Sequence, residues 1–414
     1  MSNIKNLKKF VNLEKIKILE KKYKLPLWLY DFNTIKKKIK KLKIFDIVRF
    51  AQKSCSNLTI LKLIKKLKVK IDAVSQGEIE RAILSGFKKN SNDIIFTADL
   101  IDEETLHTVI KNKIPVNAGS LIMLKNIGKN SKKHKVWLRI NPKFGDGHSK
   151  KTNTGGEHSK HGIWNIKDAI KIIKKYQLKL LGLHIHIGSG AHEKNLKKSC
   201  FIMIKEALRL NKKIKYISAG GGLPIPYHFS EKKINIKNYY KKWDKTRKIL
   251  SKHFNKKIKL EIEPGRFIVA ESGILIAKVY VIKKNEFTTF VLINAGFNDL
   301  IRPAFYGSYH QISIIPFDSR KLNYKNTFKT VIGGPLCESG DIFNPMKNDK
   351  IKIFKLPEIK VGDYIIFHDT GAYGSAMSSN YNSRPLIAEI LIKNKKFKQI
   401  RRRQTNKEMF SLEL

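Results

Sequence analysis

The first part of the chain alternates between short apolar runs and amphipathic segments. Apolar residues recur at helical spacing in 101–111 and 166–176, which predicts helices there. Between the helical segments the apolar runs are short and mostly β-branched, as is typical of buried strands. These runs are 48–52, 71–74, 94–97, 115–118, 136–141, 180–187, 217–219 and 260–263. Strands that alternate with helices in this way predict an α/β fold, and eight of them favour a (β/α)8 TIM barrel. An open, doubly wound sheet is the alternative, but no phosphate-loop pattern follows the first strand.

The pattern changes after Glu263, where strand-like runs are separated by turns rich in Gly, Asn and Pro and few helices are evident. The runs are 274–282, 289–293, 330–333, 363–368 and 386–392. They predict a C-terminal all-β barrel or sandwich domain. A further apolar run at 27–30 precedes the barrel and could pair with that domain. We therefore expect an N-terminal segment (1–30) whose strand joins the β-domain, a barrel domain (31–270) and a β-domain (271–414).

Composition narrows the class of protein. The chain has 414 residues, of which 42% are hydrophobic, so it is long enough for two domains with real cores. The formal net charge is +50, but lysines are spread from Lys5 to Lys407 rather than gathered in a stripe or tail, so no specific nucleic-acid partner is predicted. The odd number of cysteines, three, argues against a disulfide framework and for a reducing compartment, and there is no C-x-x-C pair to suggest a zinc site. No signal-peptide or membrane-span run is found, and we expect a cytoplasmic enzyme without membrane association.

Residues that could take part in catalysis or ligand binding follow several of the predicted strands. Active sites of (β/α)8 barrels lie at the carboxyl ends of the strands. The first strand leads to Lys53, the second to Asp72, the sixth to His184 and His186, the seventh to Gly220-Gly221-Gly222, and the eighth to Glu263-Pro264-Gly265-Arg266. The two histidines share a face and could be a metal pair, but no third ligand stands at convincing spacing, so no metal site is predicted.

Taken singly, each of these residues has an ordinary explanation. A lysine at a strand end is usually a solvated charge, a strand histidine is usually a hydrogen-bonded core residue, and glycines are common in turns. Their combination is more specific. A lysine amine condenses with aldehydes, and glycine-rich turns with a nearby hydroxyl such as that of Ser189 suit phosphate binding. Together they fit a phosphorylated aromatic aldehyde held as a lysine imine.

Six motifs carry a resemblance to a known family: FAQKSCSN, HIHIGSG, GGGLP, EPGRF, GGPLCESGD and HDTGAYG, in this order along the chain. With these motifs the sequence resembles the diaminopimelate decarboxylases, of the alanine racemase-like, fold-type III class of pyridoxal 5'-phosphate enzymes. The resemblance covers almost the whole chain and implies a barrel followed by a β-domain. It departs from common members at Phe50, at the Ser54-Cys55-Ser56-Asn57 run and at His161, where an aromatic residue is usual; these changes leave the catalytic residue types in place.

The resemblance also implies roles. Lys53 corresponds to the lysine that forms an imine with the cofactor, and Cys337 to a proton donor supplied by the neighbouring subunit. Such a donor requires a homodimer with shared active sites. The remaining cofactor-binding residues are implied to be Asp72, His186, Ser189, Gly220, Gly221, Gly222, Glu263, Gly265, Arg266 and Tyr373. The implied substrate-binding residues are Arg266, Arg302, Tyr306, Glu338 and Tyr373.

The implied substrate is meso-diaminopimelate, which would be decarboxylated to lysine and CO2 in the last step of lysine biosynthesis. Arginine forks hold carboxylates, and Glu338 suits an ammonium, which matches the two charges at the distal end of this substrate. A decarboxylase for another basic amino acid and a racemase are related alternatives. The first is disfavoured by the pair Arg266 and Arg302, and the second by Cys337, since a racemase needs a second base at that place. A non-catalytic homologue or a basic nucleic-acid binder is disfavoured by the intact Lys53, Glu263 and Cys337.

Overall fold

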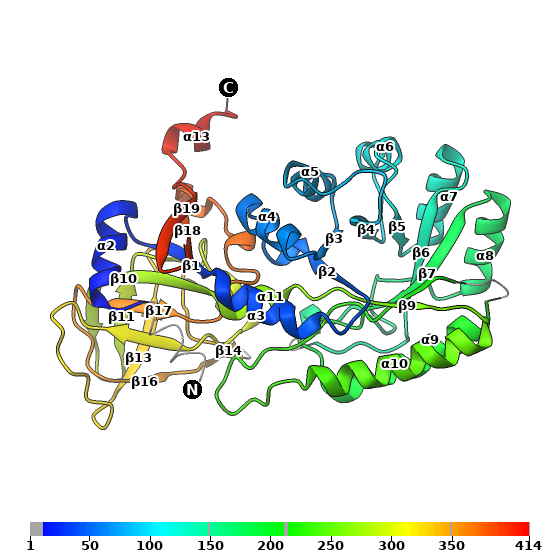
Figure 1. The fold of residues 1–414 in the computed structure, drawn as a ribbon. Helices are drawn as coiled ribbons and strands as arrows, with labels where there is room; N and C mark the ends of the chain where they lie inside the picture. Colours follow the sequence, from blue (N-terminus) through cyan, green and yellow to red (C-terminus); the bar gives the residue numbers. More distant parts are fainter. Residues whose placement is uncertain (1–10, 148–149, 211–213, 348–349, 414) are drawn as a thin grey trace. The chain divides into compact units, whose positions relative to one another are not determined.

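The computed structural model describes residues 11–147, 150–210, 214–347 and 350–413. The predicted N-terminal segment therefore lies partly outside the described residues. The chain forms two compact units (Figure 1). One unit, here called the barrel unit, comprises 36–225 and 233–268. The other, the β unit, comprises 1–35, 226–232 and 269–414, so it collects residues from both ends of the chain.

The barrel unit is built on eight parallel strands that close on themselves among the described residues, and this confirms the predicted fold class. Closure is made by the first and last strands, whose register pairs Ile47 with Glu261. The strands are β2 (Ile47–Ala51), β3 (Lys70–Ala73), β4 (Ile94–Ala98), β5 (Val116–Ala118), β6 (Lys135–Ile140), β7 (Lys179–Ile185), β8 (Tyr216–Ser218) and β9 (Lys259–Ile262).

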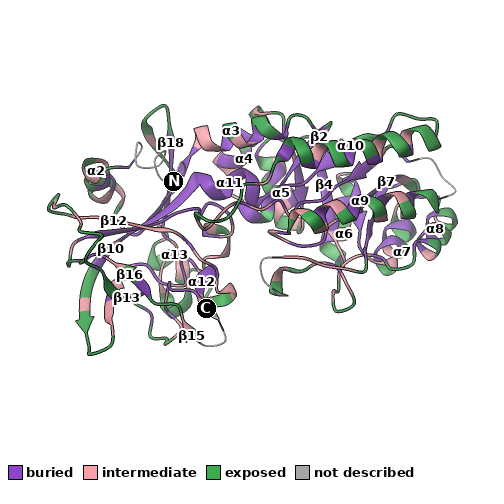
Figure 2. Cartoon of the chain, turned by 90° about the horizontal axis from the view of Figure 1, so that it is seen from below, coloured by how far each residue is buried: buried purple, intermediate pink, exposed green. Residues whose placement is uncertain are grey.

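Helices follow the strands, and side-chain caps fix where several of them begin. The Oδ1 atom of Asn57 accepts the backbone N–H of Thr59 at 2.9 Å and so caps the helix that begins at Leu58. Figure 2 shows exposed residues along α9 and α10 and buried residues in the strands. The helices are α3 (Phe32–Leu42), α4 (Leu58–Lys66), α5 (Gln76–Leu84), α6 (Glu103–Lys111), α7 (Leu121–Asn130), α8 (Ile166–Lys175), α9 (Glu193–Leu208), α10 (Ile236–His253) and the short α11 (Arg266–Val269). In the described chain, no helix combines the length and the apolarity needed to cross a bilayer.

The barrel interior carries a buried ion pair. The guanidinium of Arg49 on β2 donates to both carboxylate oxygens of Glu261 on β9, at 3.1 and 3.2 Å. A third donor of Arg49 reaches the carbonyl of Asn92 at 2.9 Å. Both side chains are buried, and a buried charge is tolerated only when it is paired. The charges of Arg49 and Glu261 are thus compensated by each other inside the barrel.

We predict that Arg49→Met destabilises the fold strongly, because Glu261 would be left as an uncompensated buried charge. The expected loss is about 3–5 kcal/mol in the free energy of unfolding, measured by urea denaturation. The double variant Arg49→Met/Glu261→Leu should recover much of this loss, since replacing both partners by apolar residues is often nearly neutral. A loss below about 1 kcal/mol for the single variant would show that the pair contributes little.

The β unit contains a nine-stranded sheet in the described residues. In this sheet β1 (Leu27–Asp31) pairs antiparallel with β10 (Gly273–Lys284) and parallel with β18 (Ala388–Lys393). The other strands are β11 (Thr289–Ile293), β12 (Ile312–Ile315), β13 (Phe328–Gly333), β16 (Phe354–Leu356), β17 (Tyr364–Phe367) and β19 (Lys396–Arg401), with β14 (Met346–Lys347) and β15 (Lys350–Ile351) in a separate small sheet.

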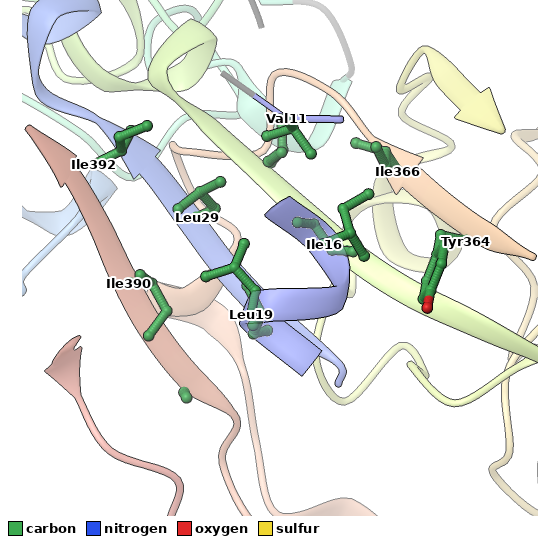
Figure 3. Packing of buried hydrophobic residues seen from close by; sticks show 12 residues of the cluster. Val11, Ile16, Leu19, Leu29, Tyr364, Ile366, Ile390 and Ile392 are labelled. Carbon is green, nitrogen blue, oxygen red and sulfur yellow. The ribbon is translucent and has the colours of Figure 1, made fainter. Parts of the chain in front are cut away.

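Helix α2 (Leu13–Tyr23) packs on this sheet. Its apolar residues Ile16 and Leu19 lie over β1 and β18, in contact with the cluster that contains Leu29 and Ile390 (Figure 3). All four side chains are buried. The described N-terminal residues are therefore part of the core of the β unit. The remaining helices of this unit are short: α12 (Arg302–Tyr306) and α13 (Asn406–Phe410).

Candidate active site

Lys53 lies in a tight turn at the carboxyl end of β2. The turn is a short 3-10 helix, Gln52–Ser54, and the side chain of Lys53 is exposed. The hydroxyl of Ser54 donates to the carbonyl of Ala51 at 2.8 Å, and the amide of Gln52 donates to the carbonyl of Glu78 at 3.1 Å. These bonds fix the backbone on both sides of Lys53. The amine is thus presented at the edge of the barrel where Asp72 of the neighbouring β3 also lies.

Gly265, in the loop after β9, approaches the same turn closely. A Cβ atom at this position would lie 2.7 Å from the hydroxyl oxygen of Ser54. A larger residue would therefore push the β9 loop away from the turn of Lys53. The two loops come from the first and last strands of the barrel, which closure makes neighbours.

Glu263, just after β9, is a buried carboxylate with two strong partners. One oxygen accepts the hydroxyl of Ser218 at 2.9 Å, and the other lies 2.8 Å from Nε2 of His184. Burial raises the pKa of Glu263, but His184, Arg49 and Ser218 outweigh it and hold the pKa at about 2. The carboxylate is therefore ionised at neutral pH and is suited to bind a protonated ring nitrogen.

The pKa of Asp72, at the end of β3, is shifted in the opposite direction. Burial, assisted by the negative charge of Glu263, raises its pKa to about 6, and the charge of Lys53 opposes this shift. Two carboxyl groups in one barrel thus have pKa values on either side of the ordinary range. Such a separation is frequent at functional sites, although structural networks produce it too.

His186 follows β7 and carries an unprotonated nitrogen. Its Nδ1 accepts the backbone N–H of Gly221 at 3.2 Å. Burial lowers the pKa of His186 well below its ordinary value, and the charges of Arg139 and Lys53 lower it further. The ring is therefore neutral and planar, as a residue that stacks on a heteroaromatic ring should be.

The three consecutive glycines after β8 occupy space that no side chain could share. A Cβ on Gly220 would lie 2.3 Å from the carbonyl oxygen of Ile185, and one on Gly222 would lie 2.5 Å from that of Gly188. Both glycines also have positive φ angles, +62° and +88°. Such a turn exposes backbone N–H groups, which is the usual way to bind a phosphate.

Arg266 adds a cation to the donors at this end of the barrel. Its Nε and Nη2 donate to the hydroxyl of Ser189 at 3.3 and 2.9 Å, and the arginine is buried. A guanidinium, a hydroxyl and a glycine turn form a donor set that fits a phosphate ester. The donor set, the ionised Glu263 and the amine of Lys53 together fit pyridoxal 5'-phosphate.

Comparison with known proteins gives the same cofactor. Residues 31–270 match the family model described as "Pyridoxal-dependent decarboxylase, pyridoxal binding domain". A diaminopimelate decarboxylase of Buchnera aphidicola (subsp. Acyrthosiphon pisum) is 63% identical over 410 residues, which covers 99% of each chain. The chain belongs to the diaminopimelate decarboxylase family. A crystal structure of a diaminopimelate decarboxylase with 49% identity superimposes with a TM-score of 0.94 over 98% of this chain and 97% of the other.

A second solved diaminopimelate decarboxylase, from Helicobacter pylori and in complex with L-lysine, is more distant. It is 31% identical, has a TM-score of 0.84 and covers 96% of this chain and 99% of its own. The family membership and the pyridoxal-binding barrel are thus established. The roles of individual residues are proposals, supported by the geometry described here.

Arg302, at the start of α12 in the β unit, is buried, and hydrogen bonds hold its guanidinium in place. Its Nη2 donates to the hydroxyl of Ser308 at 3.1 Å, and its Nε donates to Nε2 of His310 at 3.4 Å. Nδ1 of His310 lies 2.9 Å from the carbonyl oxygen of His368, so this nitrogen carries the proton and Nε2 is the acceptor. The guanidinium also lies 5.7 Å from the ring centre of Tyr306. This environment differs from that of a surface ion pair, the ordinary explanation of such an arginine.

Cys337 and Glu338 lie in the turn after β13, and both side chains are exposed. Tyr373 lies in the turn after β17, is half-buried and has a positive φ of +59°, an uncommon conformation for a tyrosine. Next to it, a Cβ on Gly374 would lie 2.8 Å from the ring of Trp28. The backbone beside Tyr373 is therefore closely packed against Trp28.

The structure places the predicted site residues in two groups. Those of the barrel unit follow the carboxyl ends of their strands, as expected: Lys53, Asp72, His186, Ser189, Gly220, Gly221, Gly222, Glu263, Gly265 and Arg266. Those of the β unit lie in turns or on a short helix: Arg302, Tyr306, Cys337, Glu338 and Tyr373.

Two residues of the Glu263 environment were missed by the sequence patterns. His184 was considered as a metal ligand or as a hydrogen-bonded core residue, but its partner was not foreseen: its Nε2 is bonded to Glu263. In the part of the chain that the structure describes, no group of three His, Cys, Asp or Glu side chains could hold a metal ion. Ser218 was not singled out, although its place two residues before Gly220 was an available signal.

The departure at His161 has a structural explanation. Nδ1 of His161 is hydrogen-bonded to one oxygen of Asp99, which follows β4, and Arg139 reaches the same oxygen at 3.4 Å. The backbone N–H of Gly162 donates to the other oxygen at 2.7 Å. Burial opposes ionisation of Asp99, but these partners lower its pKa. His161 therefore attaches the long connection after β6 to the loop after β4.

Proposed function

We propose that this chain catalyses the decarboxylation of meso-2,6-diaminopimelate to L-lysine and CO2, the last step of lysine biosynthesis. The observation that carries this proposal is the buried, ionised Glu263 at the same end of the barrel as Lys53 and the glycine turn. The family assignment supports it. The same family includes the Helicobacter pylori enzyme, which has been crystallised with L-lysine.

We assign each barrel residue a task toward pyridoxal 5'-phosphate. When bound, the cofactor withdraws electrons from the α-carbon of an amino acid, which lowers the barrier to loss of CO2. Lys53 would hold the aldehyde carbon, and Glu263 would keep the ring nitrogen protonated. His186 would lie against the ring. Ser189, the glycine turn, Gly265 and Arg266 would bind the phosphate, and Asp72 and Tyr373 would complete the cofactor site.

Substrate selection is assigned to charged residues of both signs. The distal end of meso-diaminopimelate carries one carboxylate and one ammonium group. The fork of Arg302 suits the carboxylate and Glu338 suits the ammonium, with Arg266, Tyr306 and Tyr373 also in contact with substrate. Diamine-forming substrates such as ornithine lack the distal carboxylate, so a buried arginine would disfavour them. Release of CO2 should therefore be fast with meso-diaminopimelate and near background with lysine, ornithine and arginine. Equal turnover of ornithine would refute this specificity.

The catalytic proton donor is proposed to come from a second copy of the chain. Cys337 is exposed and belongs to the β unit, whereas the residues assigned to the cofactor belong to the barrel unit, with the exception of Tyr373. A homodimer in which each β unit completes the partner's barrel would bring them together. We further propose a cytoplasmic location, with neither specific nucleic acid nor a membrane as partner.

Mixing two inactive variants tests the shared site. Lys53→Ala and Cys337→Ala chains should each be inactive alone. After subunit exchange, each hybrid dimer should contain one working site, so up to about a quarter of full activity should return for statistical mixing. Exchange is followed with two affinity tags, and a mixture of Lys53→Ala with itself serves as control. Absence of recovery despite confirmed exchange would place Cys337 in the site of its own chain or outside any site.

A further inference from the structure

The turn that carries Cys337 is closed by a buried carboxylate. Asp341 accepts the backbone N–H of Leu336 at 2.8 Å and that of Phe297 at 2.6 Å. Its own N–H donates to the carbonyl of Glu338 at 3.0 Å, and its carbonyl accepts the N–H of Gly334 at 2.9 Å. Asp341 therefore ties both ends of the turn together and ties the turn to the loop after β11.

Between these anchors the backbone of Cys337 has one further bond. Its N–H donates to Oδ1 of Asn382 at 2.9 Å. Asn382 has a φ of +55°, in the left-handed region that asparagine tolerates better than most residues. The adjacent Tyr381 ring stacks on Phe297, with 5.3 Å between ring centres, and Phe297 is also a donor to Asp341. The acceptor for Cys337 is thus held on the same scaffold as the turn.

We infer that Asn382 is a positioning residue for Cys337. A hydrogen bond to the backbone N–H fixes the plane of the peptide before Cys337, and with it the direction in which the Cβ–Sγ bond leaves the turn. The inference rests on the proposed function, in which the thiol proton passes from Sγ to the α-carbon after CO2 has left. The S–H bond breaks, the C–H bond forms, and the thiolate regains a proton from water.

Three variants separate this role from general stability. Asn382→Gly removes the acceptor and retains a residue that readily adopts a positive φ. Asn382→Asp retains an acceptor oxygen. Ser383→Gly is the matched control, since Ser383 has a φ of +52° and its change leaves the bond between Asn382 and Cys337 in place.

For Asn382→Gly in the holoenzyme we expect kcat to fall roughly 10-fold with little change in KM, because misplacement of a reacting group by about 1 Å can cost up to 100-fold. The alkylation rate of Cys337 by iodoacetamide, followed by mass spectrometry, should change several-fold. Cys55 and Cys200 are buried and serve as internal references. Asn382→Asp and Ser383→Gly should resemble the wild type in both measurements.

The inference is overturned if Asn382→Gly leaves kcat and the alkylation rate within about twofold of the wild type. It is also overturned if Ser383→Gly reproduces both changes, which would indicate a general loosening of the segment. A different result would refute the proposed role of Cys337 as proton donor: the Cys337→Ala variant would retain full kcat. The alkylation rate would still report whether Asn382 positions the thiol, because it requires no turnover.

Discussion

Replacing Lys53 by alanine should remove the visible absorbance of the bound cofactor and lower decarboxylation by several powers of ten. Lys53 lies in a turn whose backbone is fixed by Gln52 and Ser54, at the barrel edge shared with Asp72 and close to the loop of Gly265. Without the amine the aldehyde has no covalent attachment at this position, and the carbanion chemistry depends on a correctly held cofactor. The measurement is an absorbance spectrum of the purified protein together with CO2 release.

A matched control is Lys66→Ala, an equal change of charge at an exposed position on α4. It should leave both spectrum and turnover unchanged. Because the chain is rich in lysine, the competing hypothesis is that another lysine forms the imine with the cofactor. A Lys53→Ala protein with a normal visible spectrum and near-normal turnover would remove Lys53 from the role assigned to it.

The second large loss of activity is expected when Arg302 is replaced. Arg302→Met keeps much of the apolar length and deletes the fork, so the distal carboxylate of the substrate loses a charged hydrogen-bond partner. We expect a cost of roughly 2–4 kcal/mol, or about 30- to 1,000-fold in kcat/KM. Lysine should recover only part of this, because a point charge cannot make two parallel bonds. The cofactor spectrum should be unchanged.

Arg402→Met is a suitable control, since Arg402 is exposed in the same unit and bonds to Glu408 at the start of α13. It should not alter kcat/KM for meso-diaminopimelate. Full kcat/KM in Arg302→Met would make the buried contacts with Ser308 and His310 purely structural and would leave the substrate assignment without its main physical support.

Much of the fold was predictable because its strands have simple patterns. Short β-branched runs located the barrel strands, and apolar residues at helical spacing located α6 and α8. The strands that escaped prediction are β12, β14, β15, β16 and β19. The last of these, Lys396–Arg401, is mostly polar, and its place in the sheet depends on pairing with β18 rather than on an apolar pattern of its own.

The candidate site was predictable where residue type and position alone suffice, as for Lys53 and the glycine turn. It was not predictable where function depends on a partner far along the chain. The pKa of Glu263 is set by His184, 79 positions away in sequence, and the turn of Cys337 is held by Asn382, 45 positions away. Local patterns contain no information about such pairs, because the pairs exist only after the strands have closed or the turns have met.

The place of β1 in the sheet has a consequence during synthesis. This apolar strand is made before the barrel unit, but its partners β10 and β18 are made only after the whole barrel unit. At typical elongation rates β1 waits roughly 20–70 s for β18. An unpaired apolar strand is a template for association with other chains. The nascent chain is therefore vulnerable to aggregation at β1, and ribosome speed and early chaperone contact should influence the yield of folded protein more than the stability of the finished sheet does.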